Sequence, residues 1–329
     1  MARSVRMADI AEKLGISIVS VSKGLSGKEG ISDALRERVI ATARELGYGE
    51  TRQPSSLLSA GKSIGVLIAD RFFNENAFYY TMYRDIVTCC QGLGLVAMLE
   101  IVTAEAEKAC ELPALTQAGR VDGLIFMGEL SLDYVRKAAA LGLPYVLLDF
   151  YKNDLPADNV ISDNVHGSYL LTRHLLDSGR RGIAFVGSCT KTSSIMDRYL
   201  GYCKALIEAG LEPRADWRLE DRDDTGAYIP FVLPRELPDA FVCSCDEVAY
   251  NLVEFLTGKG FRVPQDIAVC GYDDFRYATL CRPALTTYSV NIARMAGSAV
   301  SVLNHRLKGE PVEAPVRIVP GSLILREST

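Results

Sequence analysis

The chain has 329 residues, 48% of them hydrophobic, and is therefore long enough for two or three folded units with packed cores. No apolar run approaches the roughly eighteen residues of a membrane span, and the N-terminus lacks the apolar segment of a secretory signal. The nine cysteines are scattered, and none has a histidine or cysteine partner at the spacing of a zinc site. We therefore expect a cytoplasmic protein with free thiols, no membrane association, no metal and no cofactor.

The formal net charge of −5 hides an asymmetry along the chain. Residues 1–62 carry ten Lys and Arg against seven Asp and Glu, which leaves 26 against 34 in the remainder. A basic head on an acidic body fits a DNA-binding module attached to a unit that does not contact DNA.

Residues 7–25 have the spacing of a helix-turn-helix. Apolar residues recur at helical period on both sides of a tight turn at residues 15–17: Ile10, Ala11 and Leu14 before it, and Val21 and Leu25 on one face after it. The second helix is predicted to begin at Ser17, whose hydroxyl can accept a hydrogen bond from the first turn. Because such a unit holds its second helix out for the major groove, the pattern predicts a protein that binds double-stranded DNA.

A third helix and a linker complete the head. The helix is predicted from about Ser32, with Leu35, Val39 and Leu46 on one face, so that three short helices surround a small core. Residues 48–63 are predicted to form a linker that contains a single helical turn.

From Ile64 onward, short apolar strands alternate with helices, which is typical of parallel sheets covered by helices. The first strands are predicted at residues 64–69, 95–101, 121–126 and 145–148. After a helix at about 167–177, further strands are predicted at 183–186, 240–243 and 267–270, with helices at 194–209 and 246–259. Two successive sets indicate an α/β fold of two similar doubly wound parallel-sheet lobes, with a cleft between them where small molecules bind.

Head, linker and paired lobes together resemble the LacI/GalR family of transcription regulators over nearly the whole chain. The resemblance rests on residues 8–17, 21–23 and 46–48 in the head, and on residues 64–66, 121–123, 163–164, 198–201, 271–274 and 282–287 in the body. Members of this family are ligand-controlled repressors that bind palindromic operators as dimers, and their effector-binding body is similar to periplasmic sugar-binding proteins. The resemblance therefore implies a homodimeric DNA-binding transcriptional repressor with a small-molecule effector.

The same resemblance divides the chain into a helix-turn-helix domain at residues 1–48, a hinge at 49–63 and an effector-binding domain at 64–329. Within the last, we expect an N-lobe at about 64–161 plus 290–317 and a C-lobe at about 162–289 plus 318–329. Residues 324–329 contain no apolar heptads of a coiled coil, so the expected assembly is a dimer rather than a tetramer.

By position in the family, the residues expected to contact DNA lie at the start of the second helix. Ile18, Val19 and Lys23 would face base edges, the aliphatic pair against thymine methyl groups and Lys23 toward guanine. Three serines would bond phosphates, which position the helix without reading sequence: Ser17, Ser20 and Ser22. The alternative for Ile18 is packing against the head's own core.

In the linker, Leu58 or Leu57 matches the family's leucine that wedges into the minor groove at the operator centre. Leu58 aligns better from Gly61 and Lys62. The linker is shorter than the family's and lacks its usual Pro-Asn after Tyr48, which leaves the hinge helix and the choice of leucine open.

For the cleft, the resemblance implies side chains from both lobes around a sugar-derived effector. Phe78 and Tyr79 would stack on a sugar ring or base, while Ser194 and Arg198 would make polar contacts. Asp273 would accept hydrogen bonds from ligand hydroxyls or N–H groups.

Arg222 stands where the family often has an aromatic residue. Two arginines in one cleft favour a ligand with a carboxylate or phosphate, within the classes of sugars, sugar acids and nucleosides. The alternative for Arg198 is a structural salt bridge with Asp197 or another acid. The alternative for Arg222, which lies in the acidic run 220–224, is a solvated surface position.

The sequence offers no catalytic residues, since the Gly-x-Ser-x-Gly, P-loop and Gly-x-Gly-x-x-Gly motifs are all absent. Two other functions stay open beside the repressor. A ligand-binding receptor without a DNA role would account for residues 64–329 but would leave the helix-turn-helix unexplained. A regulator controlled by a protein partner could use an acidic surface of the lobes.

Overall fold

The computed structural model of the protein describes residues 7–26, 31–46, 62–73, 77–117, 119–223, 225–311 and 316–329. The chain divides into two compact units, Met1–Gly61 and Lys62–Thr329, which we call the head and the body. No described helix has the length and the apolar character that a membrane crossing requires.

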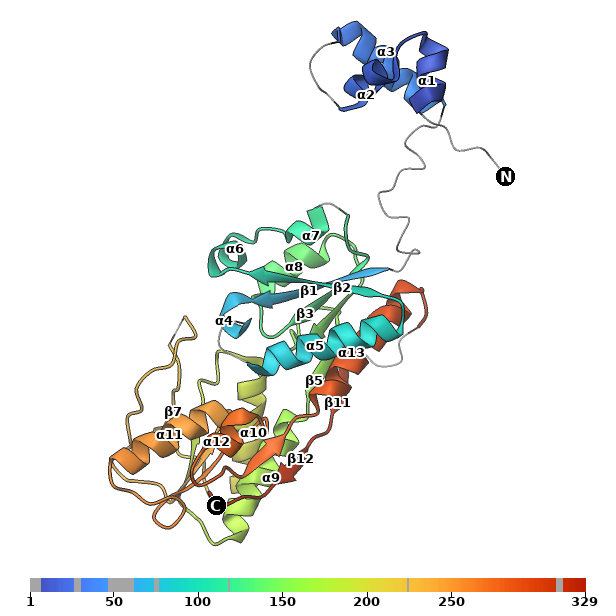
Figure 1. The fold of residues 1–329 in the computed structure, drawn as a ribbon. Helices are drawn as coiled ribbons and strands as arrows, with labels where there is room; N and C mark the ends of the chain where they lie inside the picture. Colours follow the sequence, from blue (N-terminus) through green and yellow to red (C-terminus); the bar gives the residue numbers. More distant parts are fainter. Residues whose placement is uncertain are drawn as a thin grey trace. The chain divides into compact units, whose positions relative to one another are not determined.

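Three helices form the head: α1 (Met7–Leu14), α2 (Ile18–Ser26) and α3 (Asp33–Glu45) (Figure 1). They pack around a small apolar core, which consists of Ile10, Ala11, Val21, Val39 and Ala43. Ser17 Oγ accepts a hydrogen bond from Ser20 N at 3.1 Å, and so caps α2. Ser32 Oγ accepts one from Leu35 N at 3.3 Å at the start of α3. The predicted helix-turn-helix and third helix are confirmed.

The inner face of α2 differs from the prediction at one position. Leu25, which was expected to share a face with Val21, is 37% exposed. Gly24 lies at the inner position instead, because a Cβ added there would come within 2.9 Å of Val39 Cγ1. Val21 and Gly24 are three residues apart and so face the same side, which turns Leu25 outward.

The first lobe of the body, the N-lobe, is built on a six-stranded sheet. Its strands are β1 (Ser63–Ala69), β2 (Val96–Val102), β3 (Gly123–Met127), β4 (Tyr145–Leu148), β5 (Asp158–Ser162) and β11 (Val316–Val319). All are parallel, in the order β2-β1-β3-β4-β5-β11. The central strands are continuous buried apolar runs, which is the pattern of a sheet covered on both faces.

Helices cover both faces of this sheet (Figure 1). On one face, α5 (Ala77–Gly92) and α13 (Ile292–Leu307) lie side by side. On the other face lie α6 (Ala104–Ala109), α7 (Ala114–Gln117) and α8 (Leu132–Ala139). A single turn, α4 (Asp70–Phe73), continues from the end of β1.

The C-lobe repeats this plan with a smaller sheet. Its parallel strands are β6 (Ile183–Val186), β7 (Arg218–Leu219), β8 (Ala240–Cys243) and β9 (Ala268–Cys270), in the order β7-β6-β8-β9. One face carries α9 (Asn164–Asp177) and α10 (Ser193–Glu208), and the other carries α11 (Asp246–Gly258) and α12 (Arg276–Leu280). A 3-10 turn, η1 (Ala215–Trp217), precedes β7. The predicted fold of two doubly wound parallel-sheet lobes is confirmed.

The chain crosses between the lobes three times. It runs from β5 into α9, from β10 (Thr287–Ser289) into α13, and from β11 into β12 (Ser322–Ile324). β10 and β12 pair with each other as a small antiparallel sheet. Each lobe is therefore assembled from segments that are far apart in the sequence.

Candidate functional site

The first turn of α2 presents two aliphatic side chains to solvent. Ile18 and Val19 are 52% and 65% exposed, so the alternative in which Ile18 packs in the head's core is wrong. Neither side chain is packed in the core of the head, so both are available to contact a thymine methyl group.

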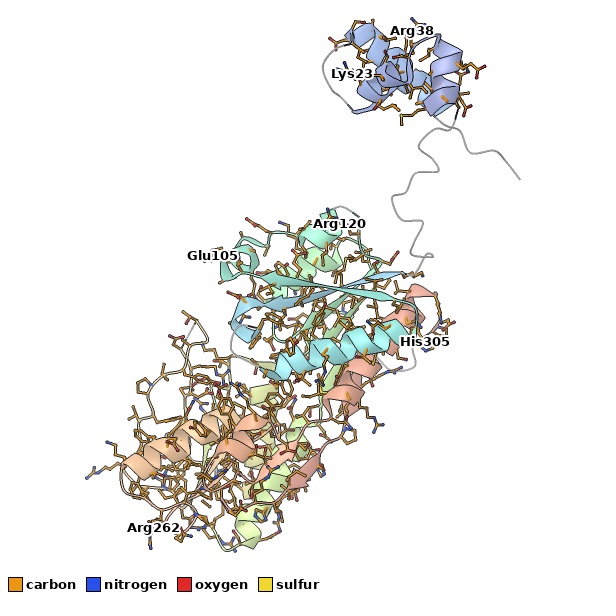
Figure 2. All side chains as sticks on the ribbon, viewed as in Figure 1. Lys23, Arg38, Glu105, Arg120, Arg262 and His305 are labelled. Atoms are coloured by element: carbon orange, nitrogen blue, oxygen red, sulfur yellow. The ribbon has the colours of Figure 1, made fainter. Side chains whose placement is uncertain are left out.

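Polar side chains flank this exposed pair. Lys23, which is labelled in Figure 2, follows Val19 by four residues and so lies on the same side of α2. It is half-buried. The hydroxyls of Ser17 and Ser20 lie 2.9 Å apart at the start of the helix, and Ser22 is exposed. The predicted wedge residue, Leu58, and its alternative Leu57 lie outside the described residues, as does most of the predicted linker.

In the body, polar and charged side chains gather where the parallel strands end. In the N-lobe, Arg71 and Phe72 follow β1, Glu129 follows β3 and Asp149 follows β4. In the C-lobe, Arg222 follows β7, Ser244 follows β8 and Asp273 follows β9. The carboxyl ends of the strands are where open α/β sheets bind ligands, so the fold brings these residues to the ligand-binding edge of each lobe.

Arg198 lies at the centre of this cluster and is only 6% exposed. Its Nε donates to Asn164 Oδ1 at 2.9 Å, its guanidinium donates to the carbonyl of Ser244, and its Nη2 lies 3.2 Å from Asp273 Oδ1. The guanidinium also stacks on the ring of Tyr272, 3.7 Å from its centroid. Arg198 thus forms the salt bridge that was its alternative role, and its partner is another predicted site residue.

Asp273 is held in an unusual backbone conformation, with a φ of 107°. Burial raises the pKa of its carboxyl to about 7, and the guanidinium of Arg198 opposes that rise. The charge of this carboxyl near neutral pH therefore depends on the groups beside it.

Asp149 belongs to the same cluster, although it is not among the predicted site residues. It follows β4 directly, has a φ of 69° and is 6% exposed. Tyr79 Oη donates to Asp149 Oδ2 at 2.8 Å, whereas Asp149 Oδ1 is buried without a hydrogen-bond partner among the described residues. Burial raises the pKa of Asp149 to about 6, and Arg198 opposes the rise. An acidic residue directly after a buried strand is the sequence signal that could have identified it.

The two aromatic side chains that were expected to stack on a ligand are both buried. Phe78 and Tyr79 are 5% and 8% exposed, and their rings meet edge to face at 5.2 Å. Tyr79 also contacts Phe72, and Phe78 contacts Phe275 of the C-lobe at 6.2 Å. Their rings are packed against protein and do not offer open stacking faces in this structure.

The start of α10 bonds across the cleft through Ser193 rather than Ser194. Both Ser193 N and Ser193 Oγ donate to Glu129 Oε2 of the N-lobe at 3.0 Å. Ser194 Oγ lies 3.0 Å from Thr192 Oγ1 within its own turn. One turn later on α10, Asp197 Oδ1 accepts from Tyr151 Oη at 2.9 Å. These contacts join the lobes at one side of the cleft.

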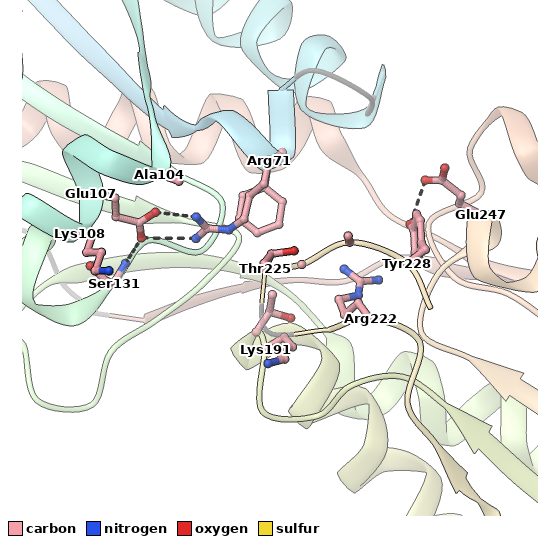
Figure 3. Close-up of a pocket in the computed structure, with 14 residues that line it drawn as sticks. Arg71, Ala104, Glu107, Lys108, Ser131, Lys191, Arg222, Thr225, Tyr228 and Glu247 are labelled. Carbon is pink, nitrogen blue, oxygen red and sulfur yellow. Dashed lines mark hydrogen bonds and ion pairs between the residues drawn. The ribbon is translucent and has the colours of Figure 1, made fainter. Parts of the chain in front are cut away.

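A pocket of about 710 Å³ opens between the lobes beside this cluster (Figure 3). Its charged lining residues are four cations, Arg71, Lys108, Lys191 and Arg222, and two carboxylates, Glu107 and Glu247. Arg71 is held by Glu107, with Nη1 to Oε2 at 2.5 Å, and by the Glu129 carbonyl at 2.7 Å. The volume is that of a small-molecule site, and the lining is net positive although the body as a whole is acidic.

Arg222 is the one residue of the predicted effector set among those that line this pocket. Its side chain is 14% exposed, so the alternative of a solvated surface arginine is wrong. Asp221 Oδ2 accepts from its Nη2 at 2.7 Å, and the guanidinium lies over the ring of Tyr228 at 5.2 Å. Tyr228 Oη in turn donates to Glu247 Oε2 at 3.0 Å.

Comparison with known protein families gives one match in the head and one in the body. Residues 6–50 match the family described as bacterial regulatory proteins, lacI family. Residues 172–329 match the periplasmic binding protein-like domain.

Curated relatives align with nearly the whole chain. The HTH-type transcriptional repressor PurR of Glaesserella parasuis serovar 5 (strain SH0165) is 29% identical, over 97% of each chain. The ribose operon repressor of Haemophilus influenzae (strain ATCC 51907 / DSM 11121 / KW20 / Rd) is 28% identical, over 98% of each chain. A solved structure of the lac repressor dimer bound to operator and the anti-inducer ONPF has the same fold, with a TM-score of 0.69, 24% identity and 99% of each chain covered.

Proposed function

Because this chain belongs to the lacI family of bacterial regulatory proteins, we propose that it represses transcription as a homodimer bound to a palindromic operator. It is a DNA-binding transcriptional regulator and not an enzyme, like the repressors to which it is similar over nearly their whole length. Its operator is double-stranded DNA, so its place of action is the bacterial cytoplasm.

The observation that carries the DNA-binding proposal is the exposed first turn of α2. Ile18 and Val19 have no partners in the head that would bury them, and Lys23 lies on the same side of the helix. In this proposal the aliphatic pair contacts thymine methyl groups and Lys23 donates to guanine, while Ser17, Ser20 and Ser22 bond phosphates. Leu58 is the proposed minor-groove wedge.

We also propose that a small-molecule effector binds in the cleft between the lobes. At the inner end, the unpartnered Asp149 Oδ1 supports a ligand that donates a hydroxyl or N–H. Asp273 and Arg198 are the polar groups beside it, Ser194 supplies a hydroxyl from α10, and Phe78 and Tyr79 close the cleft from behind. The ligand class that fits is a sugar or nucleoside.

At the outer end, the pocket around Arg222 supports an acidic group on the same ligand. Arg71 and Arg222 each have one carboxylate partner, and Lys108 and Lys191 add two further cations to the lining. A carboxylate or phosphate there would meet a net positive, partly desolvated surface. Among sugars, sugar acids and nucleosides, we therefore favour an anionic, sugar-derived effector.

Effector and operator are coupled in this proposal through the angle between the lobes. A ligand that contacts both lobes can shift the equilibrium between lobe arrangements only by the difference between its affinities for them. The same difference changes the affinity of the paired heads for the operator, and the operator changes the affinity for the effector by the same factor.

The test begins with selection of DNA from a random library by the full chain, followed by titration of the enriched site. We expect a palindromic site with two half-sites, bound by two chains. Sugars, sugar acids and nucleosides are then screened by thermal shift, and those that bind are added to the operator titration. The expected effectors are acidic and change operator affinity.

The other functions predict different results. A receptor without a DNA role would enrich no sequence and would still be stabilised by a ligand. A regulator controlled by a protein partner would enrich a site, but no compound of the panel would raise its melting temperature.

A further inference from the structure

The three crossings between the lobes meet at two buried tyrosines. Tyr272 follows β9, Tyr288 lies in β10, and each is 1% exposed. Their rings contact each other with centroids 5.1 Å apart. Neither residue was expected to have a functional role from the sequence, and neither contacts the outer pocket.

The hydroxyl of each tyrosine bonds the backbone of a different crossing. Tyr272 Oη donates to the carbonyl of Asp163, which is the first residue after β5, at 3.1 Å. The amide of Gly321, between β11 and β12, donates to Tyr288 Oη at 2.8 Å. The same two crossings are bonded to each other, because Asp163 N donates to the Val319 carbonyl at 3.1 Å.

The third crossing is held by the backbone of a site residue. Asp273 N donates to the carbonyl of Tyr288 at 2.8 Å, and Asp273 O accepts from Val290 N at 3.2 Å, just before α13. Two of the crossings therefore bond directly to the segment 272–273, which also carries the carboxyl that pairs with Arg198, and the third is held by Tyr288 and by Asp163 N.

Close packing leaves these rings little room to move. A Cβ added to Gly167 would lie 2.5 Å from Tyr272 Oη and 2.6 Å from Tyr288 Cδ1. A Cβ added to Gly321 would lie 2.6 Å from Tyr288 Cε1. On the opposite side, the guanidinium of Arg198 rests on Tyr272 at 3.7 Å. Tyr272 thus touches the cleft on one side and a crossing on the other.

We propose that Tyr272 and Tyr288 are positioning residues that latch the lobes in the arrangement seen here and couple the effector cleft to their movement. The proposal rests on the proposed function for its link to DNA. When the lobes rotate, the crossings must turn relative to the tyrosine hydroxyls. A ligand that bonds Arg198 or Asp273 changes the contact between the Arg198 guanidinium and the ring of Tyr272. It thereby favours or opposes the rotation of the lobes.

Removal of the two tyrosine hydroxyls should have different effects on their backbone partners. The Asp163 carbonyl also accepts from Gly167 N at 2.9 Å, so it keeps a partner when Tyr272 loses its hydroxyl. The Gly321 amide would lose the acceptor that Tyr288 provides. Because an unsatisfied, partly buried amide costs more than a lost second bond, Tyr288→Phe should release the latch further than Tyr272→Phe.

The test compares three variants of the full chain: Tyr272→Phe, Tyr288→Phe and the matched control Tyr202→Phe. Tyr202 is also 1% exposed, and its hydroxyl donates to a backbone carbonyl, that of Ile183, at 2.7 Å. That bond lies wholly within the C-lobe. All three changes remove one buried hydroxyl and keep the ring.

The direct readout is hydrogen exchange at the Ser193 amide in the absence of DNA and effector. This amide donates across the cleft to Glu129, so it exchanges only when the lobes separate there. We expect exchange to be about fivefold faster in Tyr288→Phe, the size of one lost hydrogen bond, less in Tyr272→Phe and unchanged in Tyr202→Phe. Equal exchange at Ser193 in all three variants and the wild type would overturn the latch.

The second readout is affinity for the DNA site enriched by the wild type. Tyr272→Phe and Tyr288→Phe should each change this affinity by about threefold to fivefold, whereas Tyr202→Phe should leave it unchanged. Faster exchange with unchanged operator affinity would overturn the coupling to DNA. Failure of the wild type to enrich any DNA would contradict the proposed function itself, and exchange at Ser193 would still decide whether the tyrosines latch the lobes.

Discussion

The start of α2 exposes the apolar side chains of Ile18 and Val19, whereas the cleft of the body buries the charged side chains of Arg198 and Asp149 and most of that of Asp273. Both arrangements depart from the usual division of apolar residues inside and charged residues outside. In the head, the exposed apolar side chains form a surface that a bound molecule can cover. In the body, the buried charges need a partner, which either a ligand or another group of the protein provides. Mutation of the exposed side chains of α2 should therefore affect DNA binding without changing stability, whereas mutation of the charged side chains of the cleft should affect ligand binding and stability together.

The strongest effect should follow from Arg198→Ala. It leaves Asp273, Asn164 and the Ser244 carbonyl without their partner, so we expect a loss of about 3–5 kcal/mol in the free energy of unfolding together with loss of effector binding. Trp217, the single tryptophan, lies in the body, and its fluorescence reports unfolding in urea. Arg214→Ala is the matched control, because Arg214 also pairs with carboxylates and lies over an aromatic ring, but at the surface, so that the stability of this variant should hardly change. Equal stability of both variants would mean that the cleft arginine has no structural role.

Asp149→Asn should remove a pH dependence. Burial raises the pKa of Asp149 from 3.8 to about 6, so between these values the folded protein holds a proton that the unfolded chain has lost. The stability contributed by Asp149 is thus present below pH 4 and lost as the pH rises to about 6. The difference in the free energy of unfolding between the wild type and Asp149→Asn should therefore fall by at most about 3 kcal/mol across this window. Urea titrations at several pH values measure it.

Asp266→Asn is the control for that titration. The side-chain bond from Arg262 lowers the pKa of Asp266 to about 2, so its contribution changes below pH 4 and is constant above it. If the difference in the free energy of unfolding between the wild type and Asp149→Asn is also constant from pH 4 to pH 6, the buried carboxyl of Asp149 does not hold a proton in that range.

In the head, Lys23→Ala should reduce discrimination at one base of each half-site by about 1–3 kcal/mol. Lys13→Ala changes the same charge, but Lys13 lies on α1 and pairs with Glu45 at 2.8 Å. Titrations against single-base variants of the operator separate the two, because the control should leave the base preferences as they are. A uniform loss across all sequences would assign Lys23 to phosphate contacts.

The smallest change in stability should come from Ile18→Ala. Since the side chain is 52% exposed, the free energy of unfolding of the head should move by less than about 0.5 kcal/mol, while preference for one base is lost. Val21→Ala, three residues later and fully buried, should cost about 2 kcal/mol and leave the base preferences intact. A destabilised Ile18→Ala head would contradict the separation of binding from folding in α2.

The sequence predicted best where a strand is a continuous apolar run. The bounds expected for β4, β6 and β8 coincide with those observed, because each run is flanked by polar or turn residues. β5 was not predicted, since Asp158, Asn159 and Ser162 are polar although all three are buried. β10, β11 and β12 were not predicted either, because each contains a polar or charged residue, Thr287, Arg317 or Ser322, and so is not a continuous apolar run.

Within the site, the sequence could supply residue types but not their neighbours. Arg222 lies in a run of acidic residues that is typical of a surface. Asp221 beside it is nevertheless buried, where its Oδ1 accepts from Ser188 N at 2.7 Å and its Oδ2 holds Arg222. Phe78 and Tyr79 are at the expected positions, but only packing against Phe72 and Phe275 decides that their faces are covered. Asp149 was not predicted, because its only sequence signal is its position directly after a buried strand, and the resemblance to the family gave it no role.

The threefold crossing of the chain has a consequence for synthesis. The N-lobe sheet lacks its last strand until residues 316–319 have been made, and the C-lobe lacks β12 until residues 322–324 have followed. Neither lobe can close its core while the chain is still short, whereas the three helices of the head are complete by residue 45. During translation, the head can therefore fold on the ribosome long before the body can, and the incomplete body is the part that depends on protection from aggregation.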